Sequence, residues 1–273
     1  MTRYFIETNV LAGLTYTHDR WHREVKPLYQ NNTLYTSEYV IYEYCNQRRH
    51  DPSIVSDPSK LSADPDAENG KYRHIGKILE DRIPFFDKQI RQLQREGMTV
   101  EKVVDAFIDH FEIREQAEPQ IRSYFQDYFS TRELTDRNAR RAVQDLRDLI
   151  LWAAEKNKDI LMEKVKIRRS AYDQMVAERE IIKEEIGLGE WGMSREDLQW
   201  VLDAIHVMQQ GELDRFVTGD KSDVAYFKHT LTNEFGISVL YATKEFYSDD
   251  LVERPEEESI KTIDGTDPEI VDD

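Results

Sequence analysis

Two strand-like segments at opposite ends of the chain lead into acidic residues. Arg3 to Ile6 is followed directly by Glu7, and Arg215 to Thr218 is followed, after one glycine, by Asp220. Further short strands are predicted at Leu34 to Thr36 and at Ile237 to Tyr241. Helix-like segments alternate with these strands, which predicts an α/β fold with a parallel sheet. Because ligands of such sheets bind outside the carboxyl ends of the strands, Glu7 and Asp220 are expected to lie at a binding edge.

The predicted helices of this core carry further acidic residues. Asn9 is predicted to cap a helix after the first strand, and Ser37 to begin a helix that runs to about Arg49 and carries Glu43 beside its apolar stripe. Ser194, with Asp197 three residues later, predicts the start of a helix that carries Asp203 and ends near Gly211. A last helix is predicted from about Asp223 to Phe235, before Gly236.

Between the two halves of the core lies a long segment of different character. Asp51 to Gly70 is rich in Asp, Ser and Pro, which is typical of an exposed loop, and Tyr72 to Ile186 is almost wholly helical in pattern, without a strand signal. We therefore expect an α/β core in two parts, 1–50 and 194–248, a mostly α-helical insertion at 51–193, and an acidic, disordered tail at 249–273.

Composition limits the class of protein. The length of 273 residues and a hydrophobic content of 39% suffice for a real core. A single cysteine excludes an internal disulfide framework and a thiolate zinc site. The formal charge of -17 opposes binding to nucleic acid. The tail, however, holds eleven acidic residues against Arg254 and Lys261, so about half of the excess negative charge lies in the tail and not in the core. No apolar run is long enough to cross a bilayer and no signal-peptide pattern is present, so a soluble cytoplasmic protein is expected.

The four acids of the core suggest a metal site. Hydrolysis of a phosphodiester gains from divalent cations that neutralise phosphate oxygens and lower the pKa of water, and these cations prefer clustered carboxylates. The candidate ligands and catalytic residues are Glu7, Glu43, Asp203 and Asp220. Asp223 is a possible fifth catalytic acid, or alternatively a helix N-cap.

Other interpretations of these residues remain open. With 54 acids in the chain, Glu43 is equally well explained as an exposed helical residue. Asp203 shares a polar helix face with Gln199, His206 and Gln210. The alternative to a metal site is that this face simply meets water. His206 is interpreted as an orienting residue or a bystander. Thr8, Asn9 and Thr218 are supporting candidates, with turn and cap roles as the alternative.

These segments, taken together, resemble those of the PIN-domain nucleases. Phe5-Ile6-Glu7-Thr8-Asn9-Val10-Leu11 is similar to the opening strand of that family. Asp203-Ala204-Ile205-His206 and Phe216-Val217-Thr218-Gly219-Asp220 are similar to its closing half. The resemblance covers roughly residues 1 to 50 and 194 to 245. It implies a three-layer α/β/α PIN-like core, a Mg²⁺ or Mn²⁺ site, and ribonuclease activity of the kind found in VapC-type toxins and RNA-processing nucleases. The family usually has Asp where this chain has Glu7.

The substrate and partners follow from the same interpretation. RNA is the expected substrate, and Arg140, Arg141, Arg168 and Arg169 are candidate contacts, since Arg137 to Arg169 holds ten basic residues against five acidic ones. A solvated face with paired acids is the alternative. A toxin would need an antitoxin-like protein partner, and a homodimer is plausible. The competing function is a catalytically degenerate PIN-like protein that binds a protein or a nucleic acid.

Overall fold

The computed structural model describes residues 1–45, 73–189, 192–219 and 224–242. These residues form two compact units. The sheet unit contains the described residues of Met1–Ala12, Glu24–His74 and Met162–Arg254. The helical unit contains those of Gly13–Arg23 and Ile75–Leu161. The predicted tail, 249–273, lies outside the described residues.

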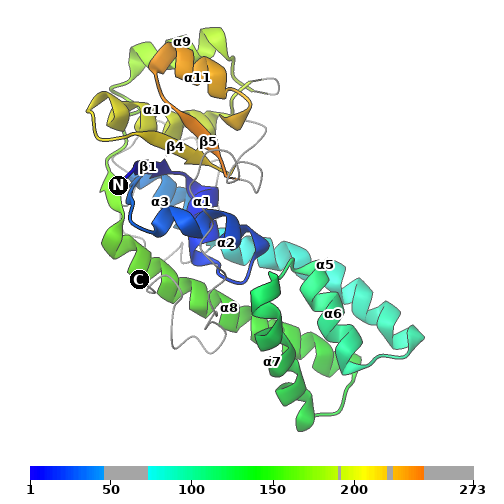
Figure 1. The fold of residues 1–273 in the computed structure, drawn as a ribbon. Coiled ribbons are helices and arrows are strands. Elements are labelled where there is room, and N and C mark those ends of the chain that lie inside the picture. Colours follow the sequence, from blue (N-terminus) through cyan, green and yellow to red (C-terminus); the bar gives the residue numbers. More distant parts are fainter. Residues whose placement is uncertain (46–72, 190–191, 220–223, 243–273) are drawn as a thin grey trace. The chain divides into compact units, whose positions relative to one another are not determined.

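A five-stranded, all-parallel sheet is the framework of the sheet unit. Its strands lie in the order β3-β2-β1-β4-β5. They are β1 (Arg3–Ile6), β2 (Thr33–Ser37), β3 (Lys166–Arg168), β4 (Arg215–Thr218) and β5 (Val239–Tyr241). Figure 1 shows β1, in blue, beside β4, in yellow, although they come from opposite ends of the chain. The prediction of an α/β fold with a parallel sheet is confirmed.

The central strands are short and buried, as the sequence predicts. Phe5 and Ile6 of β1 are fully buried, and so are Phe216 and Val217, their partners in the register of β4. The Phe5 and Phe216 rings meet in a T-shaped arrangement, with 5.8 Å between their centroids. A strand buried on both faces is a continuous apolar run, which is the pattern that identified β1 and β4.

The helices of the sheet unit follow its strands. After β1 comes α1 (Thr8–Thr15), which runs on into the helical unit. The others are α3 (Glu38–Cys45) after β2, α9 (Val176–Glu185) after β3, α10 (Arg195–Gln209) and α11 (Lys228–Phe235), with the 3-10 helix η1 (Lys26–Tyr29) before β2. Two predicted caps are present: the Ser194 hydroxyl accepts a bond from the Asp197 N–H, and Gly236 ends α11 with a φ of 72°.

The helical unit is built from longer helices. Its helices include α5 (Arg73–Glu96), α6 (Val100–His110), α7 (Glu118–Ser130) and most of α8 (Asp136–Lys164), with the 3-10 helix η3 (Glu115–Ala117) and much of α2 (Arg20–Val25) (Figure 1). The Phe107 and Phe111 rings stack in its core with centroids 4.4 Å apart. Phe125 packs against Phe107 in a T-shaped arrangement. Since these aromatic residues recur at helical spacing, their burial is the expected result.

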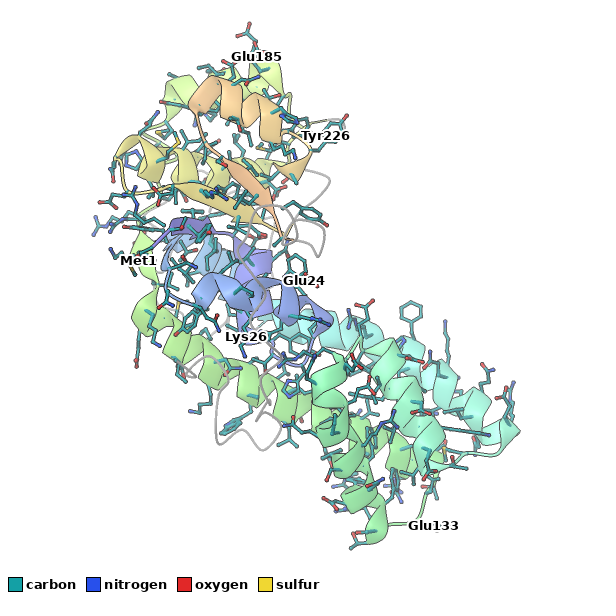
Figure 2. All side chains as sticks on the ribbon, viewed as in Figure 1. Met1, Glu24, Lys26, Glu133, Glu185 and Tyr226 are labelled. Atoms are coloured by element: carbon teal, nitrogen blue, oxygen red, sulfur yellow. The ribbon has the colours of Figure 1, made fainter. Side chains whose placement is uncertain are left out.

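The sequence prediction of a helical stretch as far as Ile186 was wrong at β3. Lys166 to Arg168 form an edge strand that pairs with β2, and the structure places β3 and α9 in the sheet unit. Three residues flanked by charges carry too little apolar periodicity to mark a strand. No helix among the described residues has the length and apolar character that crossing a bilayer requires. Large apolar side chains are mostly buried, and Tyr226, 76% exposed, is an exception that Figure 2 shows on the surface.

Candidate carboxylate site

Glu7 lies at the switch point of the sheet. From β1 the chain continues to β2 and β3 on one side, and β4 and β5 lie on the other, so the carboxyl ends of β1 and β4 border the place where the strand order reverses. The Glu7 side chain is 1% exposed. Its Oε1 accepts a bond of 2.7 Å from the Gly219 N–H, and its Oε2 accepts one of 2.5 Å from the Asn9 N–H.

These bonds correct the prediction that Asn9 caps the first helix. The helix α1 begins at Thr8, and the side chain that accepts a bond from its first turn is that of Glu7. The length of the Glu7 side chain matters for these two bonds. It allows one carboxylate to reach a backbone N–H on each side of the switch point.

Glu43 reaches the same edge from α3. Its Oε2 accepts a hydrogen bond from the hydroxyl of Thr8, the first residue of α1. Glu43 is half-buried. The interpretation of Glu43 as an ordinary exposed helical residue is therefore wrong, because its carboxylate is held by a residue adjacent to Glu7.

Asp203 is as deeply buried as Glu7. It lies on α10, is 1% exposed, and its Oδ1 accepts bonds from the Ala171 N–H at 2.7 Å and the Ser170 hydroxyl at 3.1 Å. Its Oδ2 is buried and has no hydrogen-bond partner among the described residues. The alternative in which the helix face of Asp203 and Gln199 meets water is wrong, because both residues are buried.

Burial changes the acid–base behaviour of Asp203. Removal from water raises the pKa of this carboxyl to about 7. The Ser37 hydroxyl, the Ala171 N–H and the Ser170 hydroxyl oppose the shift. Ser37 acts from nearby, without forming a hydrogen bond of normal geometry to Oδ2. Near pH 7 the group therefore passes between a neutral acid, which tolerates burial, and a buried carboxylate.

Tyr39, on α3, links the carboxylates electrostatically. Burial raises the pKa of its phenol, and the negative charges of neighbouring acids raise the pKa further; these acids are Glu43, Glu196, Asp197 and Asp203. Glu43 and Asp203 are thus both close enough to act on one phenol, although they come from different helices. The described part of the chain contains no group of three or more His, Cys, Asp or Glu residues arranged to hold a metal ion. Asp220 and Asp223 lie outside the described residues.

The supporting candidates lie in different places. Thr8 donates to Glu43, and Thr218, the last residue of β4, is fully buried. The Asn9 backbone donates to Glu7. His206 lies in the last turn of α10 and forms a 2.8 Å bond with the Gln210 side chain. Among the described residues, the His206 side chain forms no hydrogen bond to Glu7, Glu43 or Asp203.

The four candidate RNA-binding arginines divide into two kinds. Two of them have acidic partners. The Arg140 Nε lies 3.5 Å from Asp87 Oδ1, and its Nη2 lies 3.7 Å from Asp136 Oδ2. Arg168 forms an ion pair with Glu212, and its guanidinium lies over the Tyr35 ring. Arg141 and Arg169 are exposed. Arg140 and Arg141 belong to the helical unit, whereas Arg168 and Arg169 belong to the sheet unit.

Sequence reasoning missed two residues of this edge. Ser170 follows β3 and bonds to Asp203, and the Gln199 side chain bonds to Ser170. The missed strand concealed Ser170, because only β3 brings residue 170 to the carboxyl edge. Gln199 carried a usable signal, since it precedes Asp203 by one helical turn. Comparisons with protein-family models, with curated proteins and with solved structures found no match to this chain.

Proposed function

We propose that this protein is a metal-dependent nuclease, specifically an endoribonuclease that hydrolyses phosphodiester bonds. The observation that supports it best is the arrangement of Glu7, Glu43 and Asp203, which reach one edge of a parallel sheet at and beside its switch point. That is where the ligands of open α/β sheets bind. Asp220 follows the last residue of β4 by two positions in the sequence and lies outside the described residues.

The proposed cation is a hard divalent one, Mg²⁺ or Mn²⁺; the described acids do not by themselves form a group of three that could hold it, and the proposal takes Asp220 as a further ligand. Such cations take oxygen ligands, and Asp203 offers a buried Oδ2 that no described residue satisfies. Glu7, Glu43, Asp203 and Asp220 would hold the cation, and Asp223 would assist. When bound, the cation supplies neutralisation of phosphate charge and a lowered pKa of water. The Gly219 and Asn9 N–H groups keep the Glu7 carboxylate oriented, and the Thr8 hydroxyl does the same for Glu43.

The PIN-like three-layer core is part of the proposal. Its support is the five-stranded parallel sheet together with the order of the acids along the chain. The helical unit has no counterpart in the resembling segments, so it has no part in the proposed chemistry.

An RNA substrate is supported by a basic edge on the sheet unit. Lys164 and Lys166 are exposed; the Lys164 ammonium lies 4.9 Å from the Tyr29 ring centre and the Lys166 ammonium 5.1 Å from that of Tyr35. Neither has an acidic partner among the described residues, and exposed Arg169 follows them. Because the rings are occupied by cations, this edge suits phosphates better than bases.

Cleavage of a mixed pool of structured and single-stranded RNA tests the proposal. Wild type, Asp203→Asn and Asp220→Asn are compared with Mn²⁺, with Mg²⁺ and with a chelator, at low and high salt. We expect metal-dependent cutting by wild type and a loss of at least about 100-fold in either variant, since each removes a charged ligand. Asp145→Asn, the same substitution at an exposed position of α8, is the matched control and should cut like wild type.

The outcomes separate the two functions. Equal cutting by wild type and both variants would come from a contaminant and would remove the catalytic assignment. No cutting by wild type in any metal, combined with retained RNA binding, would favour the degenerate binding protein instead.

A further inference from the structure

Ser170 is the centre of a small polar network on α10 and the segment after β3. Its hydroxyl donates to Asp203 Oδ1 at 3.1 Å and accepts a hydrogen bond from the Gln199 side-chain Nε2. Gln199 is 1% exposed, and Ala171, beside Ser170, is equally buried. Asp203 and Gln199 lie one turn apart on the same helix, and Ser170 joins them from a different segment.

The direction of the bonds in this network is set by the amide. A serine hydroxyl has one hydrogen, and the Gln199 Nε2 can only donate. Because Gln199 donates to Ser170, the single hydroxyl hydrogen is left for Asp203 Oδ1. Together with the Ala171 N–H, this places two donors on Oδ1, whereas no described residue, Ser37 included, donates a hydrogen bond of normal geometry to Oδ2.

A purely structural purpose does not explain the network. Besides Asp203 Oδ2, the Gln199 Oε1 is also buried without a hydrogen-bond partner among the described residues. Each unsatisfied buried polar atom destabilises the folded chain, so an apolar residue in place of Gln199 would serve a merely structural core better. The arrangement is explained if one oxygen of Asp203 must be held still while the other stays available.

We propose that Ser170 and Gln199 are positioning residues, which hold Asp203 through its Oδ1 so that Oδ2 is presented to a divalent cation. This inference rests on the proposed function. It adds to it a pair of residues that touch neither cation nor substrate and act through Asp203. Outer hydrogen-bond partners of this kind change metal affinity about 10- to 100-fold when they are removed.

The test is direct binding of Mn²⁺ alone to the full chain, measured by calorimetry and by the melting temperature with and without the ion. Ser170→Ala removes the hydroxyl, and Gln199→Met keeps the volume of the side chain but removes its donor. We expect Mn²⁺ affinity to fall about 10- to 100-fold in Ser170→Ala and by a smaller factor in Gln199→Met. Ser170→Thr, which keeps a hydroxyl, should restore most of the affinity, and Ser238→Ala is the matched serine control.

The comparison with the metal-free protein separates positioning from folding. If Ser170→Ala and Gln199→Met change only the melting temperature of the metal-free protein and leave Mn²⁺ affinity at the wild-type value, the positioning role is overturned and the metal site stands. If wild type binds no Mn²⁺, the metal site itself fails and this inference fails with it. Should Ser170→Ala not fold, the pair Gln199→Met and Ser170→Thr still decides the question.

Discussion

The Glu7 carboxylate accepts a 2.7 Å hydrogen bond from the backbone N–H of Gly219, which lies 212 residues further along the chain. The bond joins the ends of β1 and β4 at the switch point. A second bond, from the Asn9 N–H, ties the same carboxylate to α1. Glu7 is therefore both a candidate ligand and a cap, and the two roles can be separated by changing its length.

Glu7→Asp should lower stability by about 2 kcal/mol. The shorter side chain cannot reach both N–H groups, and a hydrogen bond to a charged group is worth about 1.5 to 3 kcal/mol. Urea denaturation measures the change, with Glu234→Asp, the same substitution at an exposed position of α11, as control. An unchanged midpoint for Glu7→Asp would show that the Gly219 bond contributes nothing. In the cleavage assay, robust activity of both wild type and Glu7→Asp would show that either side-chain length supports the cation.

The buried Asp203 should make stability depend on pH in metal-free buffer. Its pKa in the folded chain is about 7, above the usual 3.8, so its stabilising contribution is complete below about pH 4 and is lost as the pH rises through 7. The difference in unfolding free energy between wild type and Asp203→Asn should therefore fall by about 4 kcal/mol from pH 4 to pH 8. A difference that stays flat over this range, measured by urea denaturation with a chelator, would contradict burial of the carboxyl.

His18 of the helical unit should give stability a pH dependence of the opposite sign. It is buried, and burial together with the charge of Arg114 lowers its pKa to about 3, below the usual 6.5. Its contribution is therefore complete above pH 6.5 and is lost as the pH falls towards 3. Wild type should lose about 3 kcal/mol more than His18→Gln between pH 6.5 and pH 4. His229→Gln, exposed on α11, should follow wild type; if His18→Gln follows it as well, the assignment is wrong.

Lys164→Glu combined with Lys166→Glu should weaken RNA binding and reduce its salt dependence. If each lysine meets one phosphate, the slope of log affinity against log salt should fall by about 2. Binding is measured with the Asp203→Asn chain, so that cleavage does not interfere. Two charge reversals elsewhere on the sheet unit, Lys183→Glu with Lys228→Glu, control for total charge. An equal loss of RNA affinity in the control would show that Lys164 and Lys166 are not specific contacts of the RNA.

Local patterns predicted much of the fold. The bounds of β4 and the caps at Ser194 and Gly236 follow from apolar runs and single residues with one strong preference. The strand β3 did not follow, because its place is determined by pairing with β2 and not by its own three residues. The bond from the Gly219 N–H to Glu7 could not be predicted either, since Gly219 is brought close only by the finished sheet.

In the candidate site, too, some features could be predicted from the sequence and others could not. The acids could be chosen from their positions at strand and helix ends, but their burial could not. Gln199 and Asp203 have the spacing of a solvent-facing pair, and it is the segment after β3 that covers them. The partners of a polar group depend on tertiary contacts, and a single sequence does not contain these.

The central position of β1 has a consequence for the order of assembly. A ribosome releases β1 and β2 long before β4, yet β1 pairs with both. Until Arg215–Thr218 emerges, one edge of β1 stays open and Glu7 lacks its Gly219 donor. The helices at 75–161 need no such distant strand. Completion of the sheet, and with it of the carboxylate edge, is therefore a late event, and any activity of that edge is withheld from the nascent chain.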